Sequence, residues 1–252
     1  MPIHSSGRAG YDDVDQIPDP LIKYFQNTLH TGRGTGHQLA TTDTFVPAFA
    51  QHPAIAPLVE ADRIAFFAGA KSGSRHRNID LAFGPPGPGA VFDTNLGMLY
   101  GMPSNIKASG EYKSIMTAHG KAQGNRRDDF LQHAAATRDN HTSKAISFAI
   151  CPVNAADRYY SYTAKKWWDH GDGKLRAARA IETLKEVPRR SEPSERGLDA
   201  MWTPVLVANN DPDEAARVAR WLREYPQPAD GMELSWSWFV ERMASIYVDR
   251  FA

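Results

Sequence analysis

The chain has 252 residues, of which 42% are hydrophobic and 23% are charged, as in an ordinary globular protein with a buried core. Lysine plus arginine and aspartate plus glutamate both number 29, so the formal net charge is zero. The overall charge therefore gives no support to nucleic-acid binding, and any DNA-facing surface has to be a local basic patch.

The single cysteine, Cys151, ends a mostly apolar run and is expected to be buried. One cysteine cannot form an intrachain disulfide, and it excludes a zinc-finger framework. Residues 1–13 are polar and lack the apolar segment of a signal peptide. No apolar stretch approaches the roughly 20 residues that a membrane helix needs. We therefore expect a cytoplasmic protein that does not associate with membranes.

The N-terminal part is expected to be irregular over 1–17 and then helical from Asp19 and Pro20, which suit a helix start. The glycine-rich segment 32–36 is expected to be a loop, although its glycines do not follow the order of a P-loop. A second helical stretch is expected over 54–70.

The central part carries the strand signals. Residues 77–83 are typical of a strand that stops at the Gly/Pro-rich turn 84–90. A short returning strand is expected over 90–93, a loop over 95–104, and another strand within 106–116.

The C-terminal half of the sequence alternates between strand signals and helix signals. The nearly continuous apolar run 145–153 predicts a strand buried on both faces. This order of elements indicates an α/β fold with a central mixed sheet flanked by helices. We expect one domain over 1–252, with a core at about 75–165 and a helical part at about 174–252. The remaining expected elements are helices over 123–138, 174–185, 211–224 and 234–251 and a possible strand over 205–207.

Glu111 and Lys113 are the strongest candidates for chemistry. In a strand, residues two apart project to the same face, so a carboxylate and an ammonium would lie side by side. Such a pair suits phosphodiester hydrolysis, because the carboxylate can hold Mg²⁺ and the lysine can orient the attacking water.

Mg²⁺ usually takes one or two carboxylates, so a second acid is expected from a neighbouring strand. Asp80 lies in the convincing strand 77–83, whereas Asp93 is closer in sequence to Glu111 but lies in a weaker element. We favour Asp80 and keep Asp93 as the alternative.

The bare acidic-x-Lys pattern is weak, because Asp172-Gly173-Lys174 repeats it in a turn. The context around Glu111 adds weight. The segment 78–80 followed by 111–113 resembles the core of the PD-(D/E)XK nuclease superfamily, and 111–122 is similar to type II restriction endonuclease-like proteins. In this group the strand runs into a Met-Thr-Ala-His turn, which a helix follows. Here the turn begins at Met116. The run 144–154 resembles the buried strand that follows.

The resemblance implies a restriction-endonuclease-like core, Mg²⁺ dependence and hydrolysis that leaves 5′-phosphate ends. It implies that Asp80, or Asp93, and Glu111 hold the metal together with the Tyr112 backbone carbonyl, and that Lys113 assists the attacking water. No proline precedes Asp80 or Asp93, so the "PD" part of the pattern is incomplete and the identity of the first aspartate stays open.

Several basic residues are candidates for contacts to DNA phosphates, each with the alternative of a solvated or self-paired surface charge. The aromatic pair Trp167 and Trp168 is expected to pack in the core, and Trp236, Trp238 and Tyr247 are candidates for a dimer surface. The phosphate-contact candidates are Lys71, Arg75, Arg77, His119, Lys121, Arg126 and Arg127.

The expected function is that of a site-specific endonuclease of double-stranded DNA, of the type II restriction class. A twofold-symmetric target favours a homodimer. The alternatives are a methylation-dependent, repair or phage-defence nuclease of the same fold, and a DNA-binding protein whose nuclease-like core does not cut.

Overall fold

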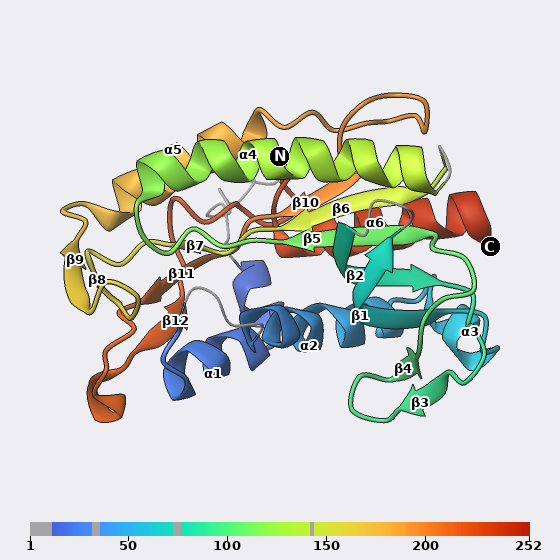
Figure 1. The fold of residues 1–252 in the computed structure, drawn as a ribbon, viewed down its shortest axis with the longest axis horizontal. Coiled ribbons are helices and arrows are strands. Elements are labelled where there is room, and N and C mark those ends of the chain that lie inside the picture. The colour runs from blue at the N-terminus through green and yellow to red at the C-terminus, as the bar shows by residue number, and fades with distance from the viewer. Residues whose placement is uncertain (1–11, 32–35, 73–76, 142–143) are drawn as a thin grey trace, which may run out of the picture.

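The centre of the molecule is a mixed sheet of seven strands in the order β10-β6-β5-β2-β1-β4-β3 (Figure 1). The computed structural model describes residues 12–31, 36–72, 77–141 and 144–252. The strands of this sheet are β1 Ala65–Ser72, β2 Arg77–Gly84, β3 Val91–Asp93, β4 Met98–Tyr100, β5 Ala108–Tyr112, β6 Ile146–Ile150 and β10 Ala200–Trp202.

The sheet is parallel at one end and mixed at the other. β5, β6 and β10 run parallel, and β2 pairs antiparallel with β5 and with β1. β1 pairs parallel with β4, and the short hairpin β3–β4 forms the other edge. The expected α/β class with a central mixed sheet flanked by helices is thus confirmed.

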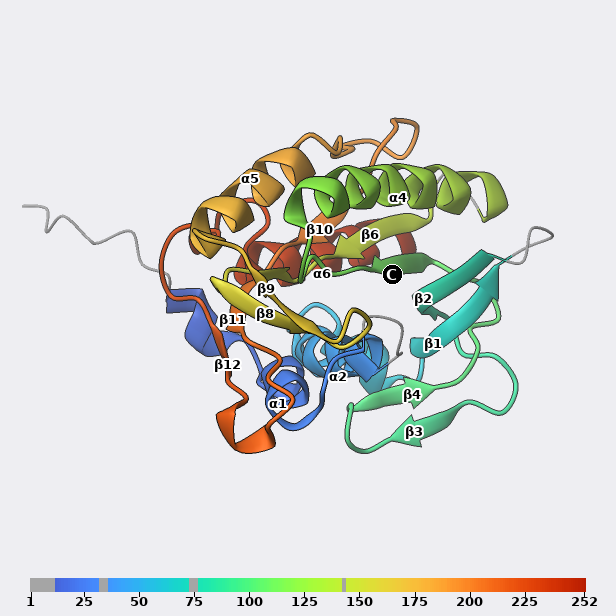
Figure 2. The same ribbon diagram turned by 60° about the vertical axis from the view of Figure 1, so that its left-hand side comes forward.

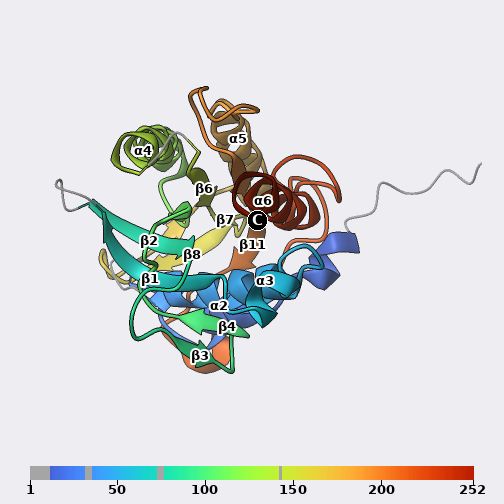
Figure 3. The same cartoon turned by 90° about the vertical axis from the view of Figure 1, so that its right-hand side faces the viewer.

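Helices cover both faces of the sheet. α4 packs on β6 and α5 packs on α4, whereas α6 contacts β10 and α2. Figure 3 shows α4 and α5 on one side of the sheet and α2 and α3 on the other. The helices are α1 Pro20–Asn27, α2 Gly36–Gln51, α3 Ala56–Glu60, α4 His119–Asn140, α5 Gly173–Lys185 and α6 Trp236–Phe251, with 3-10 turns at Asp12–Gln16 and Glu214–Ala216.

Strand β6 is buried on both faces, as its apolar run predicts. Ile146, Phe148 and Ile150 join the core under α2 and α6, while Ala149 and Cys151 join the core under α4 and α5. Cys151 is fully buried, which confirms the prediction.

Gly110 on the neighbouring strand β5 leaves the space that the ring of Phe148 occupies. A Cβ added at Gly110 would lie 2.3 Å from the Phe148 ring, so no side chain fits there without displacing this core residue.

A smaller sheet and a hairpin extend the fold beyond the central sheet. β7 Val153–Asn154, β11 Val205–Ala208 and β12 Ala219–Trp221 form a three-stranded sheet in the order β12-β11-β7. β8 Arg158–Ser161 and β9 Lys166–Asp169 form a two-stranded ribbon, which lies in front of β11 in Figure 2.

The helix predicted over 54–70 was wrong, because only α3 is helical and β1 follows it. Ile64, Ala65 and Phe66 are buried one after another, a pattern that an inner strand permits and an amphipathic surface helix does not.

The helix predicted over 211–224 was also wrong. Ala219 and Trp221 are buried and Arg220 is exposed, which is the two-residue period of strand β12. The part after residue 174 is therefore mixed rather than helical. The predicted loop 95–104 contains β4, and the possible strand at 205–207 is confirmed as β11.

The expectations for the tryptophans are reversed. Trp167 and Trp168, expected in the core, are exposed on β9, where cationic side chains lie over their rings. Trp236 and Tyr247, candidates for a dimer surface, are buried in the core beneath α6. Both residues lie on the buried face of α6, so their rings are unavailable to a partner. No helix among the described residues is long and apolar enough to cross a membrane.

Candidate active site

The acidic and basic residues singled out in the sequence meet where strands β2 and β5 separate. The ladder between these strands ends at the pair Leu81–Gly110. Asp80 on β2 and Glu111 on β5 come next on the two strands, and Lys113 follows the end of β5. The strand that carries Asp80 is thus a direct neighbour of the Glu111 strand, as expected, and it runs antiparallel to it.

The Asp80 carboxylate accepts a hydrogen bond from a backbone amide of β5 that lies beyond the end of the β2–β5 ladder. Asp80 Oδ2 accepts a hydrogen bond from Tyr112 N at 2.7 Å and lies 3.8 Å from Lys113 Nζ. Lys113 Nζ also pairs with Glu111 Oε1 and donates to the Tyr112 carbonyl oxygen at 3.2 Å. Two carboxylates, one ammonium and one backbone carbonyl therefore converge on a single point.

This cluster is largely withdrawn from solvent, although the lysine remains accessible. The side chains of Glu111, Asp80 and Lys113 are 7%, 13% and 25% exposed. Two carboxylates beside one ammonium leave one formal negative charge. A partly buried site that carries an excess of negative charge favours an additional cation.

Two residues that were not anticipated support the carboxylates. Gln38 on α2 donates from Nε2 to Asp80 Oδ1 at 3.0 Å. His133 on α4 lies with Nδ1 3.6 Å from Glu111 Oε2, while its Nε2 lies 3.0 Å from the carbonyl oxygen of Ser109. These contacts fix the positions of both carboxylates from two different helices.

His133 could have been recognised from helical spacing. Phe130, His133, Ala134 and Thr137 are the buried positions of α4 after its first residue, and their spacing places them on one face toward the sheet. Gln38 gave no comparable signal, because α2 was not predicted.

Asp93 lies apart from this cluster. Strands β2, β1 and β4 lie between its strand β3 and β5 in the sheet. Asp93 Oδ1 accepts from the amides of Asn95 and Leu96 at 2.9 and 3.1 Å, which stabilises the turn between β3 and β4. The structure thus brings Asp80, and not Asp93, next to Glu111.

The donor set fits Mg²⁺ with a small number of protein ligands. Within the described part of the chain, no group of three or more His, Cys, Asp or Glu side chains could hold a metal ion. The site offers two carboxylates and the Tyr112 carbonyl, and Mg²⁺ commonly binds through one or two carboxylates plus substrate phosphate and water. The chemistry of the donors is therefore compatible with Mg²⁺ and poorly suited to a zinc centre.

Most of the expected phosphate contacts do not form one patch around this cluster. Arg126 pairs with Asp129 at 2.9 Å, and Arg127 pairs with Asp128 and with Glu186, the residue that follows α5. These two arginines are thus engaged on the protein surface.

The other described candidates for phosphate contacts lie on α4 and on strands β1 and β2. Lys121 is exposed on the first turns of α4. Lys71 lies near the end of strand β1 and Arg77 begins strand β2, and Arg75 lies outside the described residues. His119, the first residue of α4, is buried and holds its Nε2 2.7 Å from the Asn154 carbonyl oxygen, so it lies away from the carboxylates.

Comparison of the sequence with known proteins gave no support for or against these assignments: no protein-family model matches the chain, and no curated protein matches it significantly.

Proposed function

We propose that the chain is a Mg²⁺-dependent endonuclease that hydrolyses double-stranded DNA at specific sites and leaves 5′-phosphate ends. One observation carries this proposal. Asp80 and Glu111, from neighbouring strands, face the same ammonium group of Lys113, with the Tyr112 carbonyl beside them. The parallel unit β5-α4-β6, with antiparallel β2 beside β5, supports a restriction-endonuclease-like core.

Asp80, Glu111 and the Tyr112 carbonyl oxygen would hold the metal ion. When bound, Mg²⁺ supplies neutralisation of the phosphate charge and lowers the pKa of a coordinated water. The acceptor oxygens that the ion needs are already positioned, because the hydrogen bonds from Gln38 and Tyr112 N hold Asp80 in place.

Lys113 contributes a positive charge that is only partly screened by solvent. In the structure its ammonium bridges the two carboxylates, which would pair with the metal ion in the active complex. The ammonium is then free to donate a hydrogen bond to the attacking water or to the phosphate oxygens, where it offsets the charge that develops in the transition state.

The partners in this proposal are double-stranded DNA and a second copy of the chain. A symmetric dimer presents two identical sites to the two strands of a symmetric target. The zero net charge means that DNA binding depends on local cations, among which the exposed Lys121 lies on the helix that follows Lys113.

The proposal is tested by incubating the purified full chain with supercoiled plasmid DNA, in Mg²⁺ and in EDTA. We expect discrete fragments with Mg²⁺ and intact plasmid with EDTA, because the two carboxylates alone cannot neutralise the phosphate. Mass measurement in solution reports the dimer in the same preparation.

Other outcomes separate the alternatives. A Mg²⁺-dependent smear would indicate a non-specific nuclease, and cutting restricted to methylated plasmid would indicate a modification-dependent one. A mobility shift without any cutting would contradict the proposed activity and favour a DNA-binding protein with a nuclease-like core.

A further inference from the structure

A second site of interest lies between the first turn of α4 and the N-terminal half of α5. A cavity of about 410 Å³ opens here, and we refer to it as the α4–α5 cavity. Its lining differs from the Asp80–Glu111 cluster, because it is rich in imidazole and guanidinium groups. The lining residues relevant here are His119, Gly120, Gln123, His170, Arg176 and Arg179.

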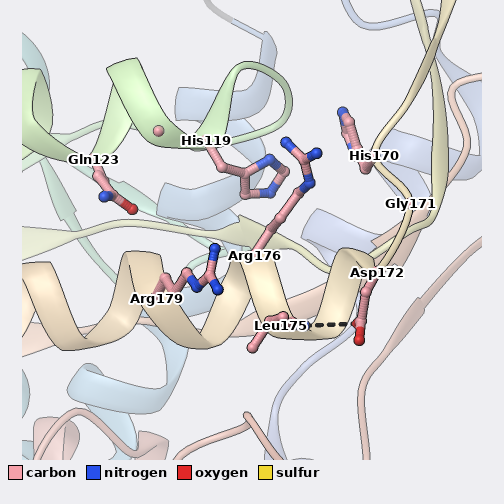
Figure 4. A pocket seen from close by; sticks show the side chains of 9 residues that line it. His119, Gln123, His170, Gly171, Asp172, Leu175, Arg176 and Arg179 are labelled. Atoms are coloured by element: carbon pink, nitrogen blue, oxygen red, sulfur yellow. Dashed lines mark hydrogen bonds between the residues drawn. The ribbon is translucent and has the colours of Figure 1, made fainter.

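Two cations of α5 point into this cavity. Arg176 and Arg179 are three residues apart, so they lie on one face of the helix. Figure 4 shows both side chains reaching from α5 toward His119 and Gln123 of α4. None of the ion pairs between described residues involves Arg176 or Arg179. Asp172, the acid beside them, caps α5 by accepting from Leu175 N at 2.8 Å. The cavity is therefore electropositive.

The N-terminus of α4 adds to this potential. The first amides of a helix have no partner within the helix and carry the positive end of its dipole. The first turn of α4 contains no acidic residue, and its N-cap residue, Ala118, forms no side-chain capping hydrogen bond. Gly120 in this turn leaves its backbone accessible to a ligand, since nothing lies within 4 Å of its Cβ position.

Two buried histidines provide an independent indication of a ligand. His119 and His170 are 2% and 3% exposed, and their rings meet edge to face with centroids 4.8 Å apart. His119 Nε2 faces the Asn154 carbonyl at 2.7 Å, and His170 Nδ1 faces the Ala156 carbonyl at 2.9 Å. The remaining nitrogens, His119 Nδ1 and His170 Nε2, are buried and have no partner. A buried polar atom without a partner is costly, so its retention points to a group that it contacts.

A metal ion does not fit this lining. The carbonyl contacts leave one lone pair on each neutral imidazole, yet the described residues offer no third His, Cys, Asp or Glu side chain that completes a metal site. Arg176 and Arg179 would also repel a cation. The same arginines attract an anion with several oxygens, because the planar guanidinium group matches a phosphate with two parallel hydrogen bonds.

We propose that the α4–α5 cavity binds a phosphate group, held by Arg176 and Arg179, by the first turn of α4 and by the free nitrogens of His119 and His170. Either a free phosphate ion or the terminal phosphate of a nucleic-acid strand carries this chemistry. The site does not depend on the nuclease activity proposed above.

The two imidazole rings can hydrogen-bond to a phosphate group whether the rings are neutral or protonated. Burial lowers the pKa of both histidines and the nearby charge of Arg176 lowers it further, whereas the carbonyl contacts and, for His170, the charges of Asp157 and Asp169 raise it. The pKa of each ring is lowered on balance, which favours the neutral form in the free cavity. A neutral ring accepts a hydrogen bond from a protonated phosphate oxygen. A phosphate anion offsets the Arg176 charge and favours imidazolium, which donates instead. In both cases the unpartnered nitrogens gain a hydrogen bond.

The test is isothermal titration calorimetry of the full chain with inorganic phosphate, in EDTA so that no cleavage contributes. We expect saturable binding of one phosphate per chain, weakened about tenfold or more by the double substitution Arg176→Ala/Arg179→Ala, because charged hydrogen bonds are the strong ones. Both arginines are exposed, so this variant retains the fold. The matched control is Lys185→Ala at the far end of α5, which removes a cation outside the cavity and is expected to bind phosphate as the unsubstituted chain does.

Two oligonucleotides of one sequence, ending in 5′-phosphate or 5′-hydroxyl, identify the source of the phosphate. Tighter binding of the phosphorylated strand, lost in the double variant, assigns the site to a strand end. Binding of inorganic phosphate without such a preference assigns it to the free ion. The absence of saturable phosphate binding, or an unchanged affinity in the double variant, would overturn the proposal.

Discussion

Substitution of Glu111 by Gln or of Lys113 by Met is expected to reduce the single-turnover rate of Mg²⁺-dependent plasmid cleavage by at least about a hundredfold, the loss typical of removing a positioned electrostatic group. Glu111→Gln removes a metal-binding charge while it keeps the shape of a side chain that is 7% exposed. Lys113→Met removes the ammonium that lies between both carboxylates.

The matched control is Lys23→Ala, which removes an exposed lysine from α1 and is expected to leave cleavage unchanged. Circular dichroism and thermal unfolding establish that each variant is folded. If folded Glu111→Gln cuts plasmid at the rate of the unsubstituted chain, the proposed site is wrong.

Asp199→Ala is expected to lower the free energy of unfolding by about 3–5 kcal/mol, as when one partner of a buried ion pair is removed. Asp199 is completely buried immediately before β10, and its carboxylate lies 2.5 Å from Arg190 Nη2 and 2.7 Å from Arg250 Nη2. It also accepts from Ser147 N of β6 at 2.8 Å. The substitution leaves the buried Arg190 without its carboxylate partner and removes a tie between β6 and β10.

For a chain of this size the expected fall in Tm is about 6–20 °C, measured by calorimetry. Glu182→Ala is the control, because its ion pair with Lys185 is exposed and should contribute no more than about 1 kcal/mol. A Tm for Asp199→Ala within the range of this control would show that the Asp199 network contributes little to stability.

The sequence contains more information about the centre of the fold than about its margins. β6 was recognisable because a continuous apolar run of this length is typical of a strand buried on both faces, and α5 because its apolar spacing is helical and Asp172 caps it. α2 was missed because it contains Pro47 and several β-branched threonines, which favour other structures locally. Its packing against both the sheet and α6 overrides these preferences.

The same distinction holds for the candidate site. Glu111 and Lys113 were accessible to sequence reasoning, because the two-residue period of a strand fixes their common face. Asp80 could be favoured over Asp93 because its strand signal is stronger, but the choice could not be made final, since it depends on which strands are neighbours in the sheet. β2 lies beside β5, while β3 lies at the edge. The contacts of Gln38 and His133 with the carboxylates depend on how α2 and α4 pack, which no local pattern specifies.

The most direct measurement of the central claim is a crystal structure of the chain soaked in Mn²⁺, with the ion located by its anomalous scattering. The account predicts one ion between the carboxylates of Asp80 and Glu111, within coordination distance of the Tyr112 carbonyl oxygen, with the Lys113 ammonium displaced from Glu111. An ion bound at Asp93 instead, or an Asp80–Glu111 pair that stays bridged by Lys113 in saturating Mn²⁺, would contradict it.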